Sequence, residues 1–115
     1  MGYRVALAGL LPTPAERSCM SGGVAWPCGV HARTAFRNWL RGRALACVVP
    51  PAPPAEVVVT PCLLGGQDAG AWLVGQGWAL AAPGDDRYAA LEEEARKAGR
   101  GLHGAAPAAP DASGD

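Results

Sequence analysis

The sequence predicts a small α+β domain that is rich in short β-strands and contains about three helices. Short apolar runs that end at proline or glycine indicate strands. Segments in which apolar residues recur at every third or fourth position indicate helices. A chain of 115 residues has room for one domain with a thin core. Its 16 glycines and 11 prolines are typical of the loops that such short elements need.

The N-terminal part is predicted to hold one strand, a long loop and one helix. Residues 3–11 are apolar and are followed by Pro-Thr-Pro, as at the end of a strand. Residues 12–28 are expected to form a loop. A helix is expected over 31–41, ended by Gly42. Its apolar residues share one stripe, namely Ala32, Ala35, Phe36, Trp39 and Leu40.

Three arginines lie on the opposite face of that predicted helix, spaced four residues apart: Arg33, Arg37 and Arg41. Arg43 follows closely. Such a stripe is typical of a solvated helix face. It is also a candidate contact for a phosphate group or an acidic partner, because guanidinium groups bind both.

Two strands are expected in the middle of the chain, over 44–49 and 56–64. The intervening residues, 50–55, contain four prolines. Proline lacks an amide donor and fixes φ, so it does not sit in a central sheet ladder. We expect a polyproline-like arm here, which is either a degraded active-site hairpin or a docking arm for an aromatic groove.

The C-terminal part is predicted to contain two further helices. Asp68 is expected to cap a helix that ends near Gln76, and 78–81 is expected to form a brief strand. Asp85 or Asp86 is expected to cap a helix that reaches Lys97. Its inward residues are Tyr88, Leu91 and Ala95, and Gly99 and Gly101 stop it.

The domain is expected to span residues 1–103, and the small, proline-containing and acidic segment 104–115 is expected to be disordered. All four tryptophans, namely Trp26, Trp39, Trp72 and Trp78, are predicted to be core or staple residues. His31 and His103 are isolated in the sequence and are expected at the surface or at the boundary of the core.

The net charge of zero does not favour a nucleic-acid partner, because such proteins usually carry a basic surplus. No run approaches the length of apolar sequence that spans a membrane. The apolar N-terminal residues 5–11 admit three interpretations: a buried strand, a short signal peptide without a clear cleavage site, or a chain whose true start lies upstream.

Four cysteines, Cys19, Cys28, Cys47 and Cys62, allow three disulfide pairings. The simplest is Cys19–Cys28 with Cys47–Cys62, since each bond then closes a local loop. Free buried thiols and a zinc site are the alternatives, although the only suggestive metal-ligand spacing is that of Cys28 and His31. Disulfides would place the protein in an oxidising compartment, either the periplasm or the exterior.

Several motifs appear in a fixed order with these cysteines. They are Trp-Pro-Cys-Gly at 26–29, Gly-Ala-Trp-Leu-Val-Gly-Gln-Gly-Trp-Ala-Leu at 70–80, Asp-Arg-Tyr at 86–88, Glu92 to Arg96 and Gly-Leu at 101–102. This order resembles bacterial nucleases of the thermonuclease (staphylococcal-nuclease-like) family, in their cysteine-bearing exported branch, over residues 3–104.

That resemblance implies an OB-fold-type barrel of five strands with helices packed on it. Members of the family have strand material ahead of the position of Tyr3, including a Gly-Asp-Thr motif that supplies an acidic calcium ligand. This chain begins after that motif. The barrel is therefore expected to lack its first strands and to expose an unpaired edge.

The resemblance also implies metal-assisted phosphodiester hydrolysis, in which aspartates hold calcium, a glutamate activates water and two arginines bind phosphate. In the first motif, Ala6 stands at an arginine position and Leu11 at a metal-binding aspartate. The glutamate position falls on Pro14, or on Glu16 if two residues are inserted. Arg4 lies two residues too early to replace the arginine at Ala6.

The second motif, Asp-Arg-Tyr-Gly-Arg, falls on 53–57 because the interval between Cys47 and Cys62 aligns without a gap. Pro53 then replaces the aspartate, Ala55 the tyrosine and Val57 the second arginine. Losing one charge-stabilising donor typically costs about 10²–10³ in rate, and here both arginines are replaced. We therefore assign no catalytic residue and no metal ligand.

The sequence is thus interpreted as a catalytically inactive thermonuclease-like domain, a pseudonuclease with a structural or protein-binding role and no cofactor. A protein partner or a second copy is expected at the open barrel edge, with the domain acting as an accessory subunit of a larger complex. The alternative is a calcium-dependent nuclease of DNA or RNA, with Arg4 and Glu16 as substitute residues. A decaying reading frame without a selected function is the third hypothesis.

Overall fold

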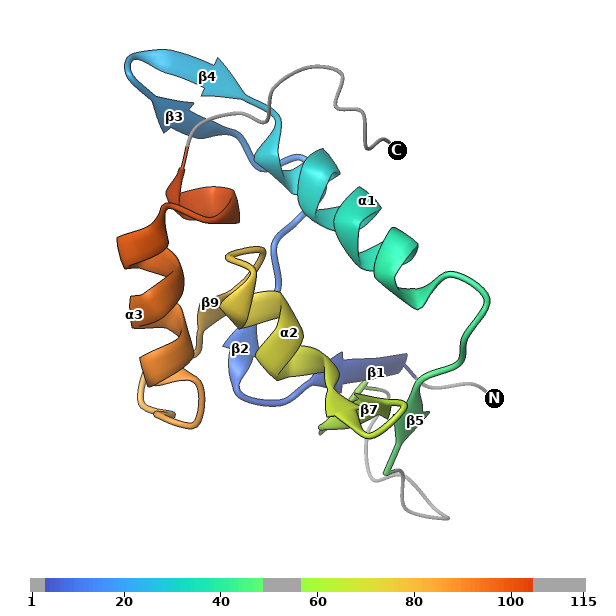
Figure 1. Cartoon of the computed structure of the whole chain (residues 1–115). Coiled ribbons are helices and arrows are strands. Elements are labelled where there is room, and N and C mark those ends of the chain that lie inside the picture. Colours follow the sequence, from blue (N-terminus) through green and yellow to red (C-terminus); the bar gives the residue numbers. More distant parts are fainter. Residues whose placement is uncertain (1–3, 49–56, 105–115) are drawn as a thin grey trace.

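A computed structural model describes residues 4–48 and 57–104 of the chain, and it has the predicted α+β composition with three helices. The helices are α1 (Cys28–Leu40), α2 (Ala69–Gly75) and α3 (Ala89–Ala98), followed by a short 3₁₀ turn, η1 (Gly101–His103). In Figure 1, α1 and α3 lie on opposite sides of the molecule, with α2 between them.

The central strands form a mixed arrangement around one extended segment. β1 (Arg4–Leu7) pairs in parallel with β6 (Val57–Thr60). After one proline the chain continues into β7 (Cys62–Leu64). β7 pairs antiparallel with β5 (Ala46–Cys47) and with β8 (Gln67–Asp68). The segment that contains β6 and β7 therefore joins strands from both halves of the chain.

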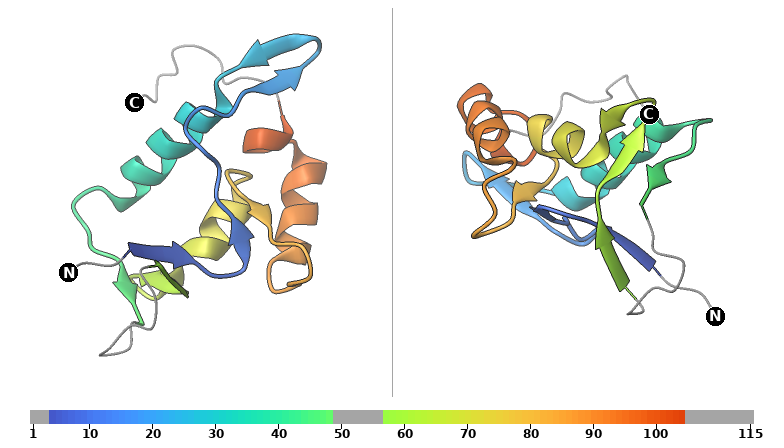
Figure 2. Two further views of the ribbon diagram at one scale, coloured as in Figure 1. Left: turned by 180° about the vertical axis from the view of Figure 1, so that it is seen from behind. Right: turned by 90° about the horizontal axis from the view of Figure 1, so that it is seen from below.

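Two further pairs complete the strands of the described residues. β2 (Leu10–Leu11) pairs antiparallel with β9 (Leu80–Ala81), and β3 (Cys19–Ser21) pairs antiparallel with β4 (Val24–Trp26). The sheets formed within residues 4–48 and 57–104 do not close into a barrel. Figure 2 shows the strands from two further sides.

The prediction of a loop over 12–28 is wrong for its second half. There the β3–β4 hairpin projects from the body of the molecule (Figure 1). Two glycines form its turn, Gly22 with φ of 59° and Gly23 with φ of 82°. Positive φ at both central residues is the geometry that a two-residue hairpin turn requires. The sequence signal was present in the Gly-Gly pair.

Several predicted elements differ from the structure at their bounds, among them the strands expected over 44–49 and 78–81, of which the described residues form only β5 (Ala46–Cys47) and β9 (Leu80–Ala81). The strand expected over 3–11 is broken into β1 and β2 at Gly9, whose φ is 84°. Helix α1 begins at Cys28 rather than at residue 31, with Pro27 in the N-cap position. The strand expected over 56–64 is interrupted at Pro61, which lacks an amide donor. The predicted arm at 50–55 lies outside the described residues, as does the tail beyond Gly104.

The predicted cap of α2 is confirmed, whereas that of α3 is wrong. The Asp68 carboxylate accepts the amides of Gly70 and Ala71 at 2.8 and 3.3 Å. Helix α3 starts only at Ala89, and the Asp85 carboxylate accepts the amide of Arg87 at 3.1 Å instead of capping the helix. The predicted stop at Gly99 is confirmed, because this residue has a φ of 67° and occupies the C-cap.

Two groups of buried residues hold the fold together. The larger lies under α2 and α3 and consists of Leu10, Leu73, Val74, Ala79 and Tyr88. The smaller surrounds a disulfide and consists of Cys19, Trp26 and Cys28, with Trp78 and Leu102 packed against it. Of the four tryptophans expected in the core, Trp26 is buried and the others are half-buried. Both histidines are half-buried, as expected for the core boundary.

Tyr88 joins the start of α3 to the start of α2 through a partly buried hydrogen bond. Its hydroxyl donates to the Asp68 carboxylate, with distances of 2.9 and 2.8 Å to the two oxygens. A Cβ on Gly70 would overlap the Tyr88 ring and hydroxyl, so glycine permits this approach. Burial, reinforced by the bond to Asp68, raises the pKa of Tyr88 to about 12.

The raised Tyr88 pKa predicts an alkaline loss of stability. The pKa of an unfolded tyrosine is about 10. Because the folded value is higher, this residue stabilises the fold fully below pH 10, and its contribution declines as the pH rises toward 12. Urea unfolding midpoints measured from pH 8 to pH 11.5 should fall more steeply for the wild type than for Tyr88→Phe. Equal slopes would contradict the assignment.

Candidate functional site

A groove of about 840 Å³ opens between α1 and the β1–β6 pair. β1 and β2 form one wall, α1 the facing wall, β5 and β6 one end, and α2 with the residues after it the floor. Arg33 is the one charged side chain among the described residues that line it. Apolar side chains supply most of the surface, including Ala6, Leu10, Phe36, Val59, Leu73 and Trp78.

The floor of the groove is fixed to the wall opposite α1. Thr13, which follows β2, donates its hydroxyl to the carbonyl of Trp78 at 2.8 Å. The amide of Trp78 donates in turn to the carbonyl of Leu73 in α2 at 2.8 Å. Leu73 and Trp78 both line the groove. These bonds hold the floor in a defined position, so the groove is built into the fold.

The segment formed by β6 and β7 is apolar on both faces apart from the buried Thr60, although only one face is covered. Inward residues are buried, as Val58 (9% exposed) and Leu64 (3%) show. Outward residues are Val57 (42% exposed), Val59 (65%) and Leu63 (45%). Strands that read as continuous apolar runs are those buried on both faces. The outward face, which enters the groove through Val57 and Val59, is therefore suited to a covering partner.

β1 offers an open edge beside this surface. Within the described residues, β1 pairs with β6 and with no strand on its other side. The open edge presents backbone amides and carbonyls that another strand can bond. Ala6 and Leu7 of β1 also line the groove. An extended segment bonded to β1 would therefore lie next to the apolar groove.

The structure brings together two positions at which the thermonuclease resemblance places arginines. Ala6 and Val57 both line the groove, where β1 and β6 run side by side. Neither side chain can bind a phosphate. Leu11, at an expected aspartate position, is 44% exposed on β2 and does not line the groove. Pro53 and Ala55 lie outside the described residues.

The proposed substitute residues are not assembled into a site by the described chain. Glu16 is exposed in the segment between β2 and β3, and it does not line the groove. Arg4 opens β1 opposite Val57, and its side chain lies outside the described part of the structure. Within residues 4–48 and 57–104, no group of three or more His, Cys, Asp or Glu side chains has the arrangement of a metal site.

The arginine stripe predicted on the first helix is exposed on α1, with Arg33 at the groove and Arg37 and Arg41 farther along. Arg41 donates to the side chain of Asn38 at 2.9 Å. Arg43 donates to the carbonyl of Trp39 at 2.7 Å and lies 5.9 Å from the centre of the Trp39 ring. The expected solvated face is therefore present at the side of the groove.

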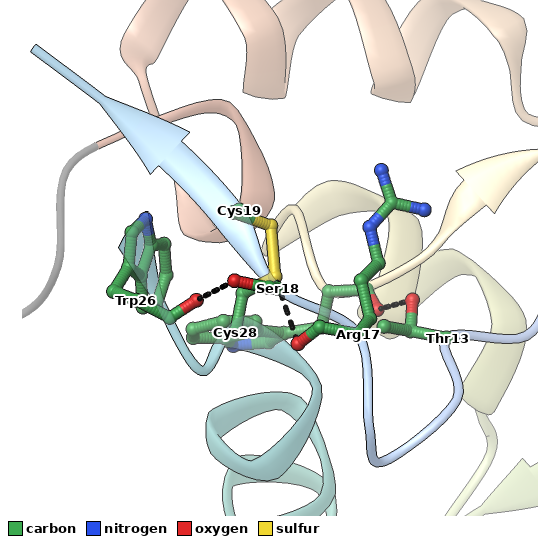
Figure 3. The surroundings of a disulfide bond; sticks show 7 residues. Thr13, Arg17, Ser18, Cys19, Trp26 and Cys28 are labelled. Atoms are coloured by element: carbon green, nitrogen blue, oxygen red, sulfur yellow. Dashed lines mark hydrogen bonds between the residues drawn. A yellow bond between two sulfur atoms is a disulfide. The ribbon is translucent and has the colours of Figure 1, made fainter. Parts of the chain in front are cut away.

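Both disulfides of the simplest pairing are present, so the described chain has no free thiol and the zinc alternative for its cysteines does not apply. Figure 3 shows Cys19–Cys28 beside Trp26, at the base of the β3–β4 hairpin. Cys47–Cys62 joins β5 to β7, and both of its residues line the groove. The first bond thus holds the start of α1, and the second holds the strand that follows α1 in the chain.

The sequence predicted the exposed arginines beside this groove, but it did not predict the apolar residues that line it. Phe36 and Trp78 were expected as core residues, and both are half-buried in the groove. The missed signal was the run of valines at 57–59, which has no polar alternation. Such a run indicates a strand that is covered on both faces.

None of the helices in the described residues is long and apolar enough to cross a membrane. Comparison with protein-family models and with curated protein sequences finds no match to this chain.

Proposed function

We propose that this protein is a non-catalytic, thermonuclease-like domain that binds an extended segment of a partner protein along β1 and in the groove. The apolar groove beside the open β1 edge is the observation that carries the proposal. In strand addition, backbone bonds supply affinity and side-chain pockets supply specificity. Both parts of that arrangement lie next to one another here.

The strand arrangement supports an OB-fold relationship. The central set of strands comprises two sheets, in which β1 pairs with β6 and β7 pairs with β5 and β8, and the β6–β7 segment runs from one sheet to the other. A barrel of five strands built on this set would have further strands at its open edges. We infer that a partner strand at β1 extends this incomplete barrel.

Loss of catalysis is supported by the chemistry of the groove walls. The resemblance places phosphate-binding arginines at Ala6 and Val57, and both positions are apolar and line the same groove. An apolar surface favours the burial of apolar side chains and opposes the desolvation of a phosphate. The replaced positions thus contribute to a binding surface of a different kind.

The proposed location is the periplasm or the exterior of the cell. Two disulfides brace this small domain, and such bonds persist in oxidising compartments. The conclusion rests on the chemistry of the cysteines, and a partner protein should be sought in the same compartment.

A nuclease assay tests the loss of catalysis. The oxidised protein, shown to be folded by circular dichroism, is incubated with single-stranded DNA and with RNA, in calcium and in a chelator. An active thermonuclease serves as the positive control. We expect no calcium-dependent cleavage, because Ala6 and Val57 occupy the positions at which the resemblance places the two catalytic arginines. Calcium-dependent cleavage that co-purifies with the monomer through successive columns would overturn the proposal.

A further inference from the structure

We infer, on the basis of the proposed binding function, that the segment bound in the groove is acidic and that the arginines of α1 hold it. The occupant would be an extended part of a partner protein with alternating apolar residues and with Asp or Glu toward α1. Three observations carry this inference: the separation of charge along the sequence, the guanidinium groups beside the groove that have no carboxylate partner within the described residues, and the lack of a free acidic strand among those same residues.

Charge is strongly separated along this neutral chain. From Arg17 to Ala55 there is no Asp or Glu, whereas this stretch contains five arginines: Arg17, Arg33, Arg37, Arg41 and Arg43. Five of the ten Asp and Glu residues, at 85, 86 and 92–94, lie on or just before α3, which is on the far side of α2 from α1 (Figures 1 and 2). The side of the groove formed by α1 is therefore basic, despite the net charge of zero.

The arginines nearest the groove have no carboxylate partner within the described residues. The ion pairs found there involve only Arg87 and Arg96, which bond to carboxylates near or on α3. Arg33 lines the groove and Arg37 lies one turn farther along α1, both exposed. In this part of the chain, neither donates a side-chain hydrogen bond to protein. Their charge is complementary to an acidic ligand.

A second copy of this chain fits the groove less well. The exposed hairpin of β3 and β4 is the extended element that projects from the body, and it lies inside the stretch without Asp or Glu. Glu92 and Glu93 of α3 already pair with Arg96 of their own helix. Within the described residues, the one acidic residue in a strand is Asp68 of β8, whose carboxylate already accepts from Tyr88 and from the amide of Gly70.

Nucleic acid is also a poorer occupant. Phosphate groups could meet the arginines, but the bases would require free aromatic faces. Trp39 and Trp72 stack on one another, with ring centres 4.5 Å apart and planes 9° from parallel, and Arg43 lies over Trp39. The apolar groove walls also suit valine or leucine side chains better than a polyanion.

The test uses three labelled synthetic peptides that share a central Val-Thr-Val-Thr-Val segment and carry two glutamates, two serines or two lysines at each end. Each is titrated into the oxidised protein by fluorescence anisotropy. We expect the glutamate peptide to bind about tenfold more tightly than the serine peptide, because two or three partly exposed ion pairs supply about that factor. We expect this preference to shrink in 0.5 M salt, which screens exposed charges.

Two double variants identify the source of the preference. Arg33→Gln with Arg37→Gln should reduce the tenfold difference in affinity between the glutamate and serine peptides to less than twofold. The matched control, Arg87→Gln with Lys97→Gln, removes two charges near and on α3 and should retain it. Val59→Lys, which charges the groove wall, should weaken all three peptides. Circular dichroism and the urea midpoint establish that each variant is folded.

The outcomes separate this inference from the proposed function. Equal binding of the serine and glutamate peptides would overturn the acidic partner and leave strand binding in place. Failure of all three peptides to bind would overturn both. Tighter binding of a single-stranded oligothymidine than of the glutamate peptide would overturn the inference in favour of nucleic acid. A dimer by light scattering that Val59→Lys converts to monomer would overturn it in favour of a second copy.

Discussion

Reduction of the two disulfides is expected to remove at least about a third of the free energy of unfolding of this protein. A chain-entropy estimate gives about 3 kcal/mol for the 15-residue separation of Cys47 and Cys62 and about 2.5 kcal/mol for the nine-residue separation of Cys19 and Cys28. A domain of this length has a total free energy of unfolding on the order of 5–15 kcal/mol. Loss of both bonds therefore approaches the limit of folding.

The measurement is urea unfolding followed by tryptophan fluorescence, with and without a thiol reductant. Cys47→Ala with Cys62→Ala and Cys19→Ala with Cys28→Ala separate the two bonds. Each pair of substitutions should cost about 2–4 kcal/mol, and the second also opens a cavity beside Trp26. If oxidised and reduced proteins unfold at the same urea concentration, the bonds do not contribute as proposed.

Gly77→Ala is expected to be the most damaging single substitution among the glycines that turn the chain. Gly77 has a φ of 82°, which L side chains rarely adopt, and an added Cβ would overlap the backbone carbonyl of Arg100. The segment that contains Arg100 is also bonded to the chain that leads into the floor of the groove. The amide of Leu102 donates to the carbonyl of Gly77 at 2.8 Å. A shift here would separate η1 from the residues after α2.

Gly84→Ala is the matched control for this prediction. Gly84 has nearly the same φ, 79°, but has open space around the added Cβ. Gly84→Ala should reduce the free energy of unfolding by only about 1 kcal/mol, which is the cost of a positive φ for alanine. Gly77→Ala should reduce it by about 3 kcal/mol or more, because the overlap with Arg100 is added. Thermal and urea unfolding of both variants give the difference. Equal losses would show that the chain relaxes around Gly77 without cost.

Local sequence determined much of the secondary structure of this protein. The cap at Asp68 and the stop at Gly99 act on atoms within a few residues, so their outcomes could be predicted. The inward position of Ala95 in α3 follows from helix periodicity in the same way, and Tyr88, which precedes this helix, is buried as predicted. The disulfides also follow from short separations, which place each pair of cysteines across one local loop.

Only the tertiary structure decided where the chain presents a surface for binding. Ala6 and Val59 stand opposite one another because β1 and β6 run in parallel, and α1 separates them in the sequence. No local propensity fixes that register, because it depends on which faces become buried when distant segments pack. The break at Gly9 and the projection of the β3–β4 hairpin depend on the same packing. The sequence could therefore predict which residues of the groove belong to strands and helices. It could not predict that these residues come together beside the arginines of α1.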